Sequence, residues 1–168
     1  KFSGKAYATS GGLHGVGSSV VNALSSELSV EVARNKTLYR QHFSRGKALG
    51  ALENLGTVSN RRGTQVRFLP DPEIFGQQAQ LKPLTLYRLA RSKAYLFAGV
   101  EIRWQCAPEL IKPDQDIPTE ITLSYPDGLK DFLMDTTREQ DVLISQPFAD
   151  NVSLSGEKVE VAITWFHD

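Results

Sequence analysis

Apolar side chains recur at helical spacing just after a run of glycines near the start of the chain. One side of a helical wheel collects Val16, Val20, Val21, Leu24 and Leu28, with serine and asparagine residues between them. Such a pattern places the apolar side chains against a core and the polar ones in water. We therefore predict an amphipathic helix that opens at the glycines.

Alternation of apolar and polar residues follows this helix and predicts β-strands. Residues 28–34 and 37–44 both alternate, and the short link through Asn35 and Lys36 is typical of a hairpin. The further strands predicted from alternation and β-branched content are 48–56, 63–70, 99–106, 119–125, 148–155 and 158–166. The strand at 119–125 is expected to pair with the one at 99–106.

A second helix is predicted over residues 83–98, where Pro83 occupies a favourable first helical position. The face that we expect to meet the core carries Leu86, Leu89, Ala90, Ala94 and Phe97. Residues 71–76 are expected to form a turn or a short helix, and residues 126–135 a short helix. Hairpins mixed with helices on one side indicate the α+β class rather than a doubly wound sheet.

Composition limits the class of protein. The chain has 168 residues, 40% of them apolar, which is enough to form a core. No apolar stretch approaches the roughly 20 residues of a membrane span, and no signal peptide is recognisable. Cys106 is the single cysteine, which excludes an intrachain disulfide, and a cytoplasmic location is expected. His42 and His167 have no partner at metal-ligand spacing, so no metal site is predicted.

Charge is distributed unevenly although the net charge is zero. Residues 1–108 contain 15 Lys and Arg against 6 Asp and Glu, whereas residues 109–168 contain 4 against 13. The first part suits an anionic partner, or the two parts attract each other. The basic residues of the predicted hairpin are Arg34, Lys36, Arg40, Arg45 and Lys47. They form either a solvated face or a weak contact with nucleic-acid phosphates.

Four glycines directly precede or open the first predicted helix: Gly11, Gly12, Gly15 and Gly17. A helix start leaves backbone N–H groups unpaired, and glycines let an anion approach them because no Cβ intervenes. Phosphate binding is one interpretation, and a tight loop that turns the chain into a helix is the other. No lysine follows as in a P-loop, and no buried strand precedes as in a dinucleotide fingerprint. A phosphate cradle here would therefore belong to a lid-like loop.

Four segments, in order along the chain, resemble one family. KFSGKAYATSGGLHGVGSSVVNALS is similar to the ATP lid and following helix of the GHKL ATPases, as found in the B subunits of bacterial type IIA topoisomerases. RRGTQVRFLPD resembles a threonine-containing strand of that ATPase domain, SYPDGLKDFL a helix near its end, and KVEVAITWFHD the first strand of the adjoining transducer domain. Within the family, KFS, SKAYLFAGVEI and DGLKDFL are more similar to the topoisomerase IV branch than to the gyrase branch.

The resemblance implies a partial two-layer GHKL (Bergerat-type) sandwich of mixed sheet and helices over residues 1–142. Residues 143–168 would form the connector and the first strands of a transducer domain, which is similar to domain 2 of ribosomal protein S5. In the family, the segment before the lid supplies the glutamate general base and an Mg²⁺ ligand. The 168 residues contain neither that segment nor the transducer lysine. We therefore expect no catalytic residue and no metal ligand here, and no activity from the chain alone.

Site residues follow from the same resemblance. The implied ATP-binding residues are Lys1, Tyr7, Gly12, Leu13, His14, Gly15, Val16, Gly17 and Thr64. Backbone N–H groups of the lid would wrap the phosphates, Lys1 would approach them, Tyr7 would contact the adenosine and Thr64 the adenine edge. At His14 the backbone is expected to matter more than the imidazole. Arg34 would lie at the pocket rim, where coumarin-type inhibitors bind in the family, and Val66 would form the pocket floor.

The implied function is ATP binding and hydrolysis, with Mg²⁺, in the region of the topoisomerase IV B subunit that drives DNA strand passage. The implied partners are a second copy of the same protein, the topoisomerase IV A subunit (ParC) and DNA, with no membrane. Three alternatives stay open: a fragment that binds no nucleotide, an ATPase of the same superfamily with another task, and a gyrase B subunit.

Overall fold

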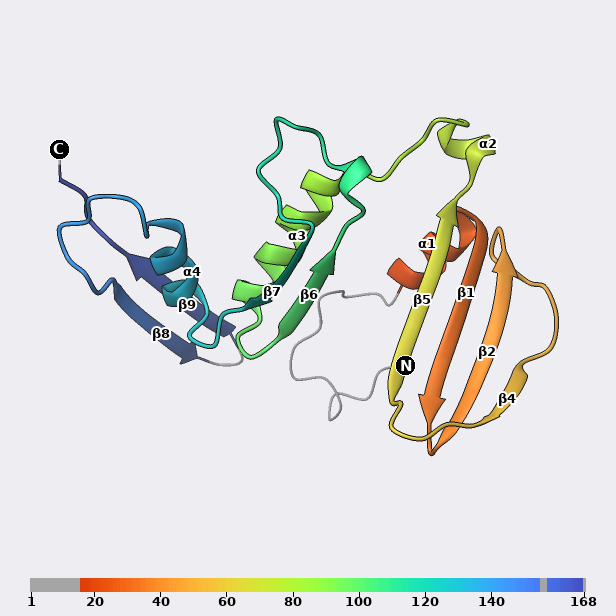
Figure 1. Ribbon diagram of the computed structural model, residues 1–168. Coiled ribbons are helices and arrows are strands. Elements are labelled where there is room, and N and C mark those ends of the chain that lie inside the picture. Colours follow the sequence, from red (N-terminus) through yellow and green to blue (C-terminus); the bar gives the residue numbers. More distant parts are fainter. Residues whose placement is uncertain (1–15, 155–156, 168) are drawn as a thin grey trace. The chain divides into compact units, whose positions relative to one another are not determined.

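The computed structural model describes residues 16–154 and 157–167. The chain divides into two compact units, Lys1–Gln80 and Leu81–Asp168, each with its own set of internal contacts. Both units combine strands with helices (Figure 1), which confirms the predicted α+β class. The domain boundary predicted between residues 142 and 143 stays a prediction.

An antiparallel sheet forms most of the first unit. Strand β1 (Ser25–Arg34) lies between β2 (Thr37–Ser44) and β5 (Gly63–Pro70), as Figure 1 shows. The short strands β3 (Lys47–Ala48) and β4 (Glu53–Thr57) both pair with β2. Strands β2 and β5 have the bounds expected from the sequence.

A two-residue turn joins β1 to β2 and confirms the predicted hairpin. Its residues Asn35 and Lys36 have φ values of 52° and 61°. Positive φ at both central positions is typical of the hairpin turn whose twist matches that of the strands. The turn sets the register, in which Leu28 lies opposite Phe43 of β2 and Phe68 of β5.

This register sorts the side chains onto two faces, because successive residues of a strand point to opposite sides. One face, called the apolar face here, carries Leu28, Val30, Phe43, Val66 and Phe68. Helix α1 (Gly17–Ala23) lies against it, since four residues of α1 and these five line one hollow. The opposite face, called the polar face, carries Ser29, Glu31, Arg40, His42, Gln65 and Arg67.

The second unit packs helix α3 (Pro83–Leu96) against the antiparallel pair β6 (Glu101–Gln105) and β7 (Glu120–Ser124). A single turn of 3₁₀ helix, η1 (Pro108–Leu110), lies in the connection between the two strands. The pairing of β6 with β7 is as predicted. The side chains at the centre of this unit are Ala94, Leu123 and Tyr125, with Tyr87, Ala90, Tyr95, Ile102 and Phe132 packed around them.

Helix α4 (Leu129–Thr136) contacts the hairpin of β8 (Phe148–Leu154) and β9 (Glu157–Ile163). All strand pairs within the described residues are antiparallel, so the mixed sheet implied by the resemblance is not seen within them. No helix among these residues is both long enough and apolar enough to cross a membrane.

Two helical predictions need correction. The first helix ends at Ala23, and Leu28 lies in β1, because the apolar spacing continues from the helix into a strand without a break. On α3, Leu86 and Leu89 are 37% and 53% exposed. Ala90 and Ala94 of the predicted face do pack in the core, but Tyr87 joins them there in place of the two leucines, at a spacing of three and four residues.

Candidate nucleotide-binding site

Helix α1 follows the glycine-rich motif directly. Val16 precedes its first turn with φ −90° and ψ −15°, and Gly17 is its first residue. No side chain caps this end of the helix, and a Cβ on Gly17 would meet nothing within 4 Å. Six residues predicted to bind ATP lie outside the described residues: Lys1, Tyr7, Gly12, Leu13, His14 and Gly15.

Thr64 and Arg34 come together at the hairpin end of the first sheet. Thr64 pairs with Val32 in the register, and Arg34 is the last residue of β1. Both line a hollow of about 810 Å³ that also contains Lys36, Arg61 and Arg62 and has no carboxylate in its lining. Arg61 is bound to Glu31, but Arg34, Lys36 and Arg62 have no carboxylate partner in the described residues, and three such cations near one hydroxyl favour an anionic ligand.

Val66 connects this region to α1. It lies two residues along β5 from Thr64, so both side chains point to the apolar face. Val66 shares a hollow of about 360 Å³ with Ser18, Ser19 and Asn22 of α1. The amide oxygen of Asn22 is buried and has no hydrogen-bond partner within the described residues. The structure therefore brings three predicted elements, the start of α1, Thr64 and Val66, to one face of the sheet.

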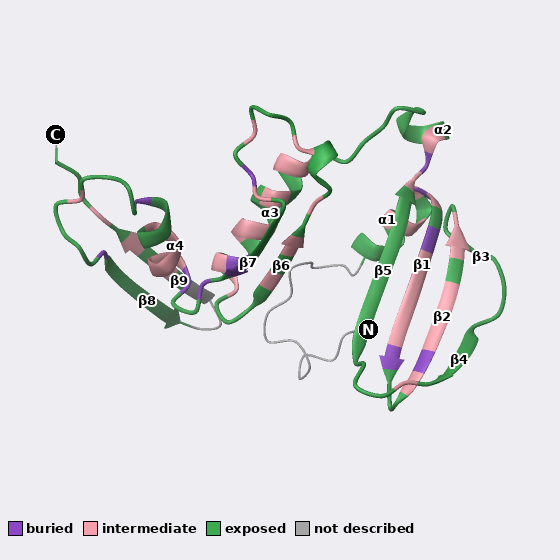
Figure 2. Cartoon of the chain, in the orientation of Figure 1, coloured by how far each residue is buried: buried purple, intermediate pink, exposed green. Residues whose placement is uncertain are grey.

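The apolar face is only partly covered in the described residues. Figure 2 shows β5 exposed along nearly its whole length. Val66 is 54% exposed and Phe68 42% exposed. An exposed apolar strand beside a cationic hollow can contact a flat, apolar ring while the basic groups attract the charged part of the same ligand. A nucleotide combines these two features.

Three backbone hydrogen bonds from two neighbouring segments hold the far end of α1 and the start of β1. The amide of Gly46 donates to the carbonyl of Asn22, and the amide of Arg45 donates to that of Ser25. The amide of Asp71 donates to the carbonyl of Leu24. Position and direction of α1 are therefore set by the β2–β3 turn and by the residue that follows β5.

Asp71 lies at the centre of this anchor and is 1% exposed. Its carboxylate accepts from the amide of Glu73 at 3.0 Å, which caps helix α2 (Pro72–Phe75). It also pairs with Arg45, whose Nε lies 2.6 Å from Oδ2. The hydrogen bond from the Glu73 amide and the neighbouring Arg45 guanidinium together hold the pKa of Asp71 below its ordinary value. The same guanidinium also pairs with Glu73, since Nη2 of Arg45 lies 2.6 Å from Oε1 of Glu73.

Sequence reasoning missed Asp71 as a site-supporting residue. The signal was present, because aspartate followed by proline at the first helical position is a typical helix start. Its pairing with Arg45, 26 residues earlier, has no local pattern.

Glu31 forms a second charged cluster, on the polar face. Arg40 donates to its Oε1 through Nε at 2.9 Å, and Arg61 lies 2.5 Å from Oε2. Hydrogen bonds from Arg40 and Arg61 lower the pKa of Glu31. Two of the five basic residues predicted to form a solvated or DNA-contacting hairpin, Arg40 and Arg45, are thus engaged in ion pairs.

The lowered pKa values of Asp71 and Glu31 predict how the stability of the protein changes as the pH falls. Their folded-state pKa values lie below the ordinary values of 3.8 for Asp71 and 4.5 for Glu31. Each therefore contributes stability above its ordinary pKa and loses it as the pH falls through the folded-state pKa. We expect the thermal midpoint to stay level from neutral pH to about 5 and to decline below about 4.5. Unfolding followed at several pH values checks this, and Asp71→Asn and Glu31→Gln should each flatten the decline. Equal slopes in all three proteins would contradict the assignment.

Within the described residues, no three His, Cys, Asp or Glu side chains gather in a way that could hold a metal ion. The described part of the chain therefore offers hydroxyl, amide and guanidinium groups to a ligand, but no metal centre.

The chain is similar in sequence and in fold to known proteins. No family model matches the chain. The chain is 53% identical to the B subunit of DNA topoisomerase 4 from Bartonella bacilliformis over 167 residues, which are 98% of this chain and 24% of that relative. It is 52% identical to the protein of the same name from Caulobacter vibrioides, with the same shares covered.

Among solved structures, the gyrase B ATPase domain of Thermus thermophilus in complex with an aminocoumarin matches with a TM-score of 0.73 and 34% identity. The match covers 89% of this chain and 38% of that one. The chain spans about a quarter of the length of the two topoisomerase IV relatives. In sequence and in fold the chain is thus similar to a segment of the B subunits of bacterial type IIA topoisomerases, and over 98% of its length to the B subunits of topoisomerase IV.

Proposed function

We propose that the chain forms the lid and the adenine side of the ATP site in a type IIA topoisomerase of the topoisomerase IV kind. ATP hydrolysis by the intact protein would drive passage of one DNA duplex through another, and so decatenation and relaxation. The observation that carries this proposal is the 53% identity to a topoisomerase IV B subunit over nearly the whole chain. The grouping of α1, Thr64 and Val66 on one face of a sheet supports it.

In this proposal different residues of the chain contact the phosphates and the adenine of ATP. The glycines of the lid expose backbone N–H groups to the phosphates, and Lys1 adds a positive charge. The Thr64 hydroxyl contacts the adenine edge, Val66 packs under the ring, and Arg34 lies at the rim. ATP supplies the bond that is cleaved. The residues of this chain bind and orient it, and closing of the lid shields it from bulk solvent while one water attacks the terminal phosphate.

Other components follow from the family. Mg²⁺ would be held by residues other than those described here, since these include no candidate cluster. A second copy of the protein, the topoisomerase IV A subunit and DNA are the proposed partners, and the cytoplasm the proposed location. We also propose that residues 143–168 begin a transducer domain.

A single substitution tests the adenine contact. In the intact protein, Thr64→Val removes the hydroxyl and keeps the shape of a side chain that strands favour. We expect the affinity for a non-hydrolysable ATP analogue, measured by calorimetry, to fall roughly 3- to 10-fold, the value of one hydrogen bond. Thr57→Val, an exposed threonine of β4 in the same unit, should leave the affinity unchanged. Equal affinities for all three proteins would refute the role of Thr64.

Two further assays separate the alternatives. Tight binding of the ATP analogue to the 168-residue chain alone would exclude a fragment that binds no nucleotide. Decatenation without supercoiling by the assembled enzyme is expected for topoisomerase IV, whereas supercoiling would identify a gyrase.

A further inference from the structure

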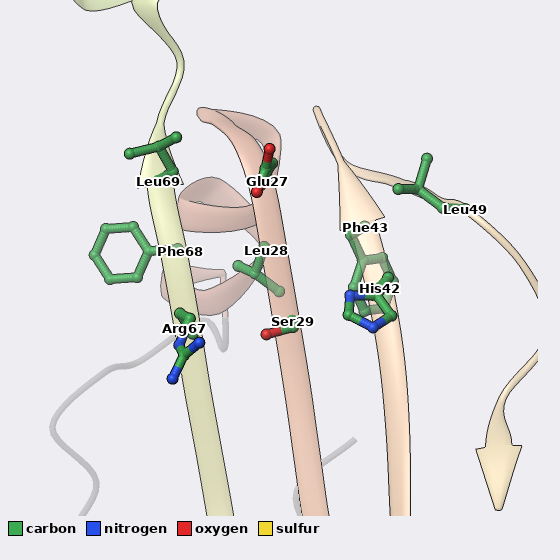
Figure 3. Close-up of a pocket in the computed structure, with 9 residues that line it drawn as sticks. All are labelled: Glu27, Leu28, Ser29, His42, Phe43, Leu49, Arg67, Phe68 and Leu69. Atoms are coloured by element: carbon green, nitrogen blue, oxygen red, sulfur yellow. The ribbon is translucent and has the colours of Figure 1, made fainter.

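A row of three polar side chains crosses the polar face of the first sheet. Ser29 of β1 lies opposite His42 of β2 and opposite Arg67 of β5. Opposite residues on antiparallel strands have their Cβ atoms about 5 Å apart. Figure 3 shows the Arg67 guanidinium and the His42 ring on either side of Ser29. Three hydrogen-bonding groups from three strands thus stand side by side.

These three side chains differ from their neighbours in having no partner in the described part of the chain. In the next row, Arg40 and Arg61 are bound to Glu31, and Arg61 also donates to Gln65. No ion pair or side-chain hydrogen bond within the described residues engages Arg67, and the same holds for the His42 ring and the Ser29 hydroxyl. Arg67 and His42 are also exposed. The row can therefore bind an external group without breaking an internal contact.

The charge of the surrounding surface favours an anion. The strands carry three carboxylates on this face, Glu27, Glu31 and Glu53, the last of which lies opposite Arg40. The cationic side chains on the same face are Arg40, Lys47, Arg67 and the Arg61 that binds Glu31, so these groups together have a net charge of +1. In Figure 3 the Glu27 carboxylate points away from the Arg67 guanidinium. Guanidinium, hydroxyl and imidazole groups together can donate to several oxygens of one phosphate.

The shape of the site favours an extended polyanion. The row lies in an open hollow of about 470 Å³ on a sheet face, lined mainly by polar side chains. A further exposed cation on the same face, Lys47, lies opposite Ser44 of β2. Ser44 and His42 are two residues apart, which corresponds to about 7 Å along a strand. Separate cationic positions along one surface match the repeating phosphates of a nucleic-acid backbone better than a single small ligand.

We propose that the row of His42, Ser29 and Arg67 binds a backbone phosphate of duplex DNA. This inference rests on the proposed function, which makes DNA the substrate. It assigns a contact surface on the side of the sheet away from α1 and from the candidate nucleotide site. Arg67 supplies the charge, and Ser29 and His42 supply further donors.

Binding of a short labelled duplex to the intact protein without nucleotide, followed by anisotropy over a series of salt concentrations, tests the proposal. For Arg67→Gln we expect roughly 3- to 10-fold weaker binding and a salt dependence reduced by about one counterion. Arg67→Lys, which keeps the charge, should restore most of the affinity. The matched control is Arg88→Gln, an exposed arginine of α3, and it should bind as the parent does.

Unchanged affinity and unchanged salt dependence in Arg67→Gln would overturn the proposal. A shift of the His42 NMR signal by inorganic phosphate, together with unchanged duplex binding in Arg67→Gln, would identify a small-anion site and would overturn it as well. DNA-independent ATP turnover separates this inference from the proposed function. If turnover is absent but Arg67→Gln still weakens duplex binding, the proposed function fails and the phosphate contact stands.

Discussion

Replacement of Gly15 by valine in the intact protein is expected to lower ATP turnover by at least about 100-fold. Gly15 lies outside the described residues, so this expectation rests on the glycine motif and on the family resemblance. A lid that binds phosphate through backbone N–H groups has no room for a Cβ between the backbone and the anion. A branched side chain would both block this approach and restrict the backbone. Steady-state ATP hydrolysis with saturating nucleotide measures the effect.

Two neighbouring substitutions serve as controls for Gly15. His14→Ala removes the imidazole and keeps the backbone, so we expect less than about a 10-fold loss if the backbone binds the phosphate. Gly17→Ala adds a Cβ where the structure has open space, so the fold should be retained and any loss of turnover reports the ligand side. Near-normal turnover in Gly15→Val, or a larger loss in His14→Ala, would place the phosphate cradle elsewhere.

Asp71→Ala is expected to cause the largest loss of stability among the substitutions considered. The carboxylate of this buried residue caps α2 and pairs with Arg45. Loss of these contacts frees Arg45 and the β2–β3 turn, whose amides hold the end of α1. We expect the midpoint of thermal unfolding to fall by roughly 5 °C or more. ATP turnover should fall as well, because α1 positions the lid in the proposed function.

The controls separate the charge of Asp71 from its capping oxygen. Asp71→Asn keeps an oxygen that can accept from the Glu73 amide but removes the charge, so an intermediate midpoint is expected. Glu73→Gln changes the outer end of the same network, where the side chain is 70% exposed. Because exposed ion pairs contribute little, its midpoint should stay close to that of the parent. If Glu73→Gln were as unstable as Asp71→Ala, the buried carboxylate would not be the centre of the anchor.

Local patterns were sufficient for much of the chain. Residues 37–44 and 63–70 form strands with the predicted bounds, because alternation with a polar turn on one side and Pro70 on the other leaves few other conformations. Pro83 likewise marks the start of α3. The segments that resemble the topoisomerase B subunits identified the family before any contact was known, since these motifs are specific in residue type and in order.

The errors lie where one pattern fits two structures. Leu28 continues the helical spacing of α1 but belongs to β1, since its position opposite Phe43 and Phe68 buries it in the sheet. Leu86 and Leu89 lie on the predicted apolar face of α3 together with Ala94, yet only Ala94 and its neighbour Tyr87 pack in the core beside β6 and β7. Burial against a partner strand decides such cases, and the partner is distant in the sequence.

Some residues of the candidate sites could be predicted from the sequence, whereas others could be found only from the structure. The glycine motif, Thr64 and Arg34 are recognisable in the sequence because their chemistry depends on residue type within a short segment. The side chains that hold or surround them are brought together by strand pairing. Arg45 meets Asp71, and Ser29 lies between His42 and Arg67, only because β1 pairs with β2 on one edge and with β5 on the other. Periodicity therefore determined the elements, whereas the register of the sheet decided which charges meet, since register alone brings distant residues within reach of a hydrogen bond.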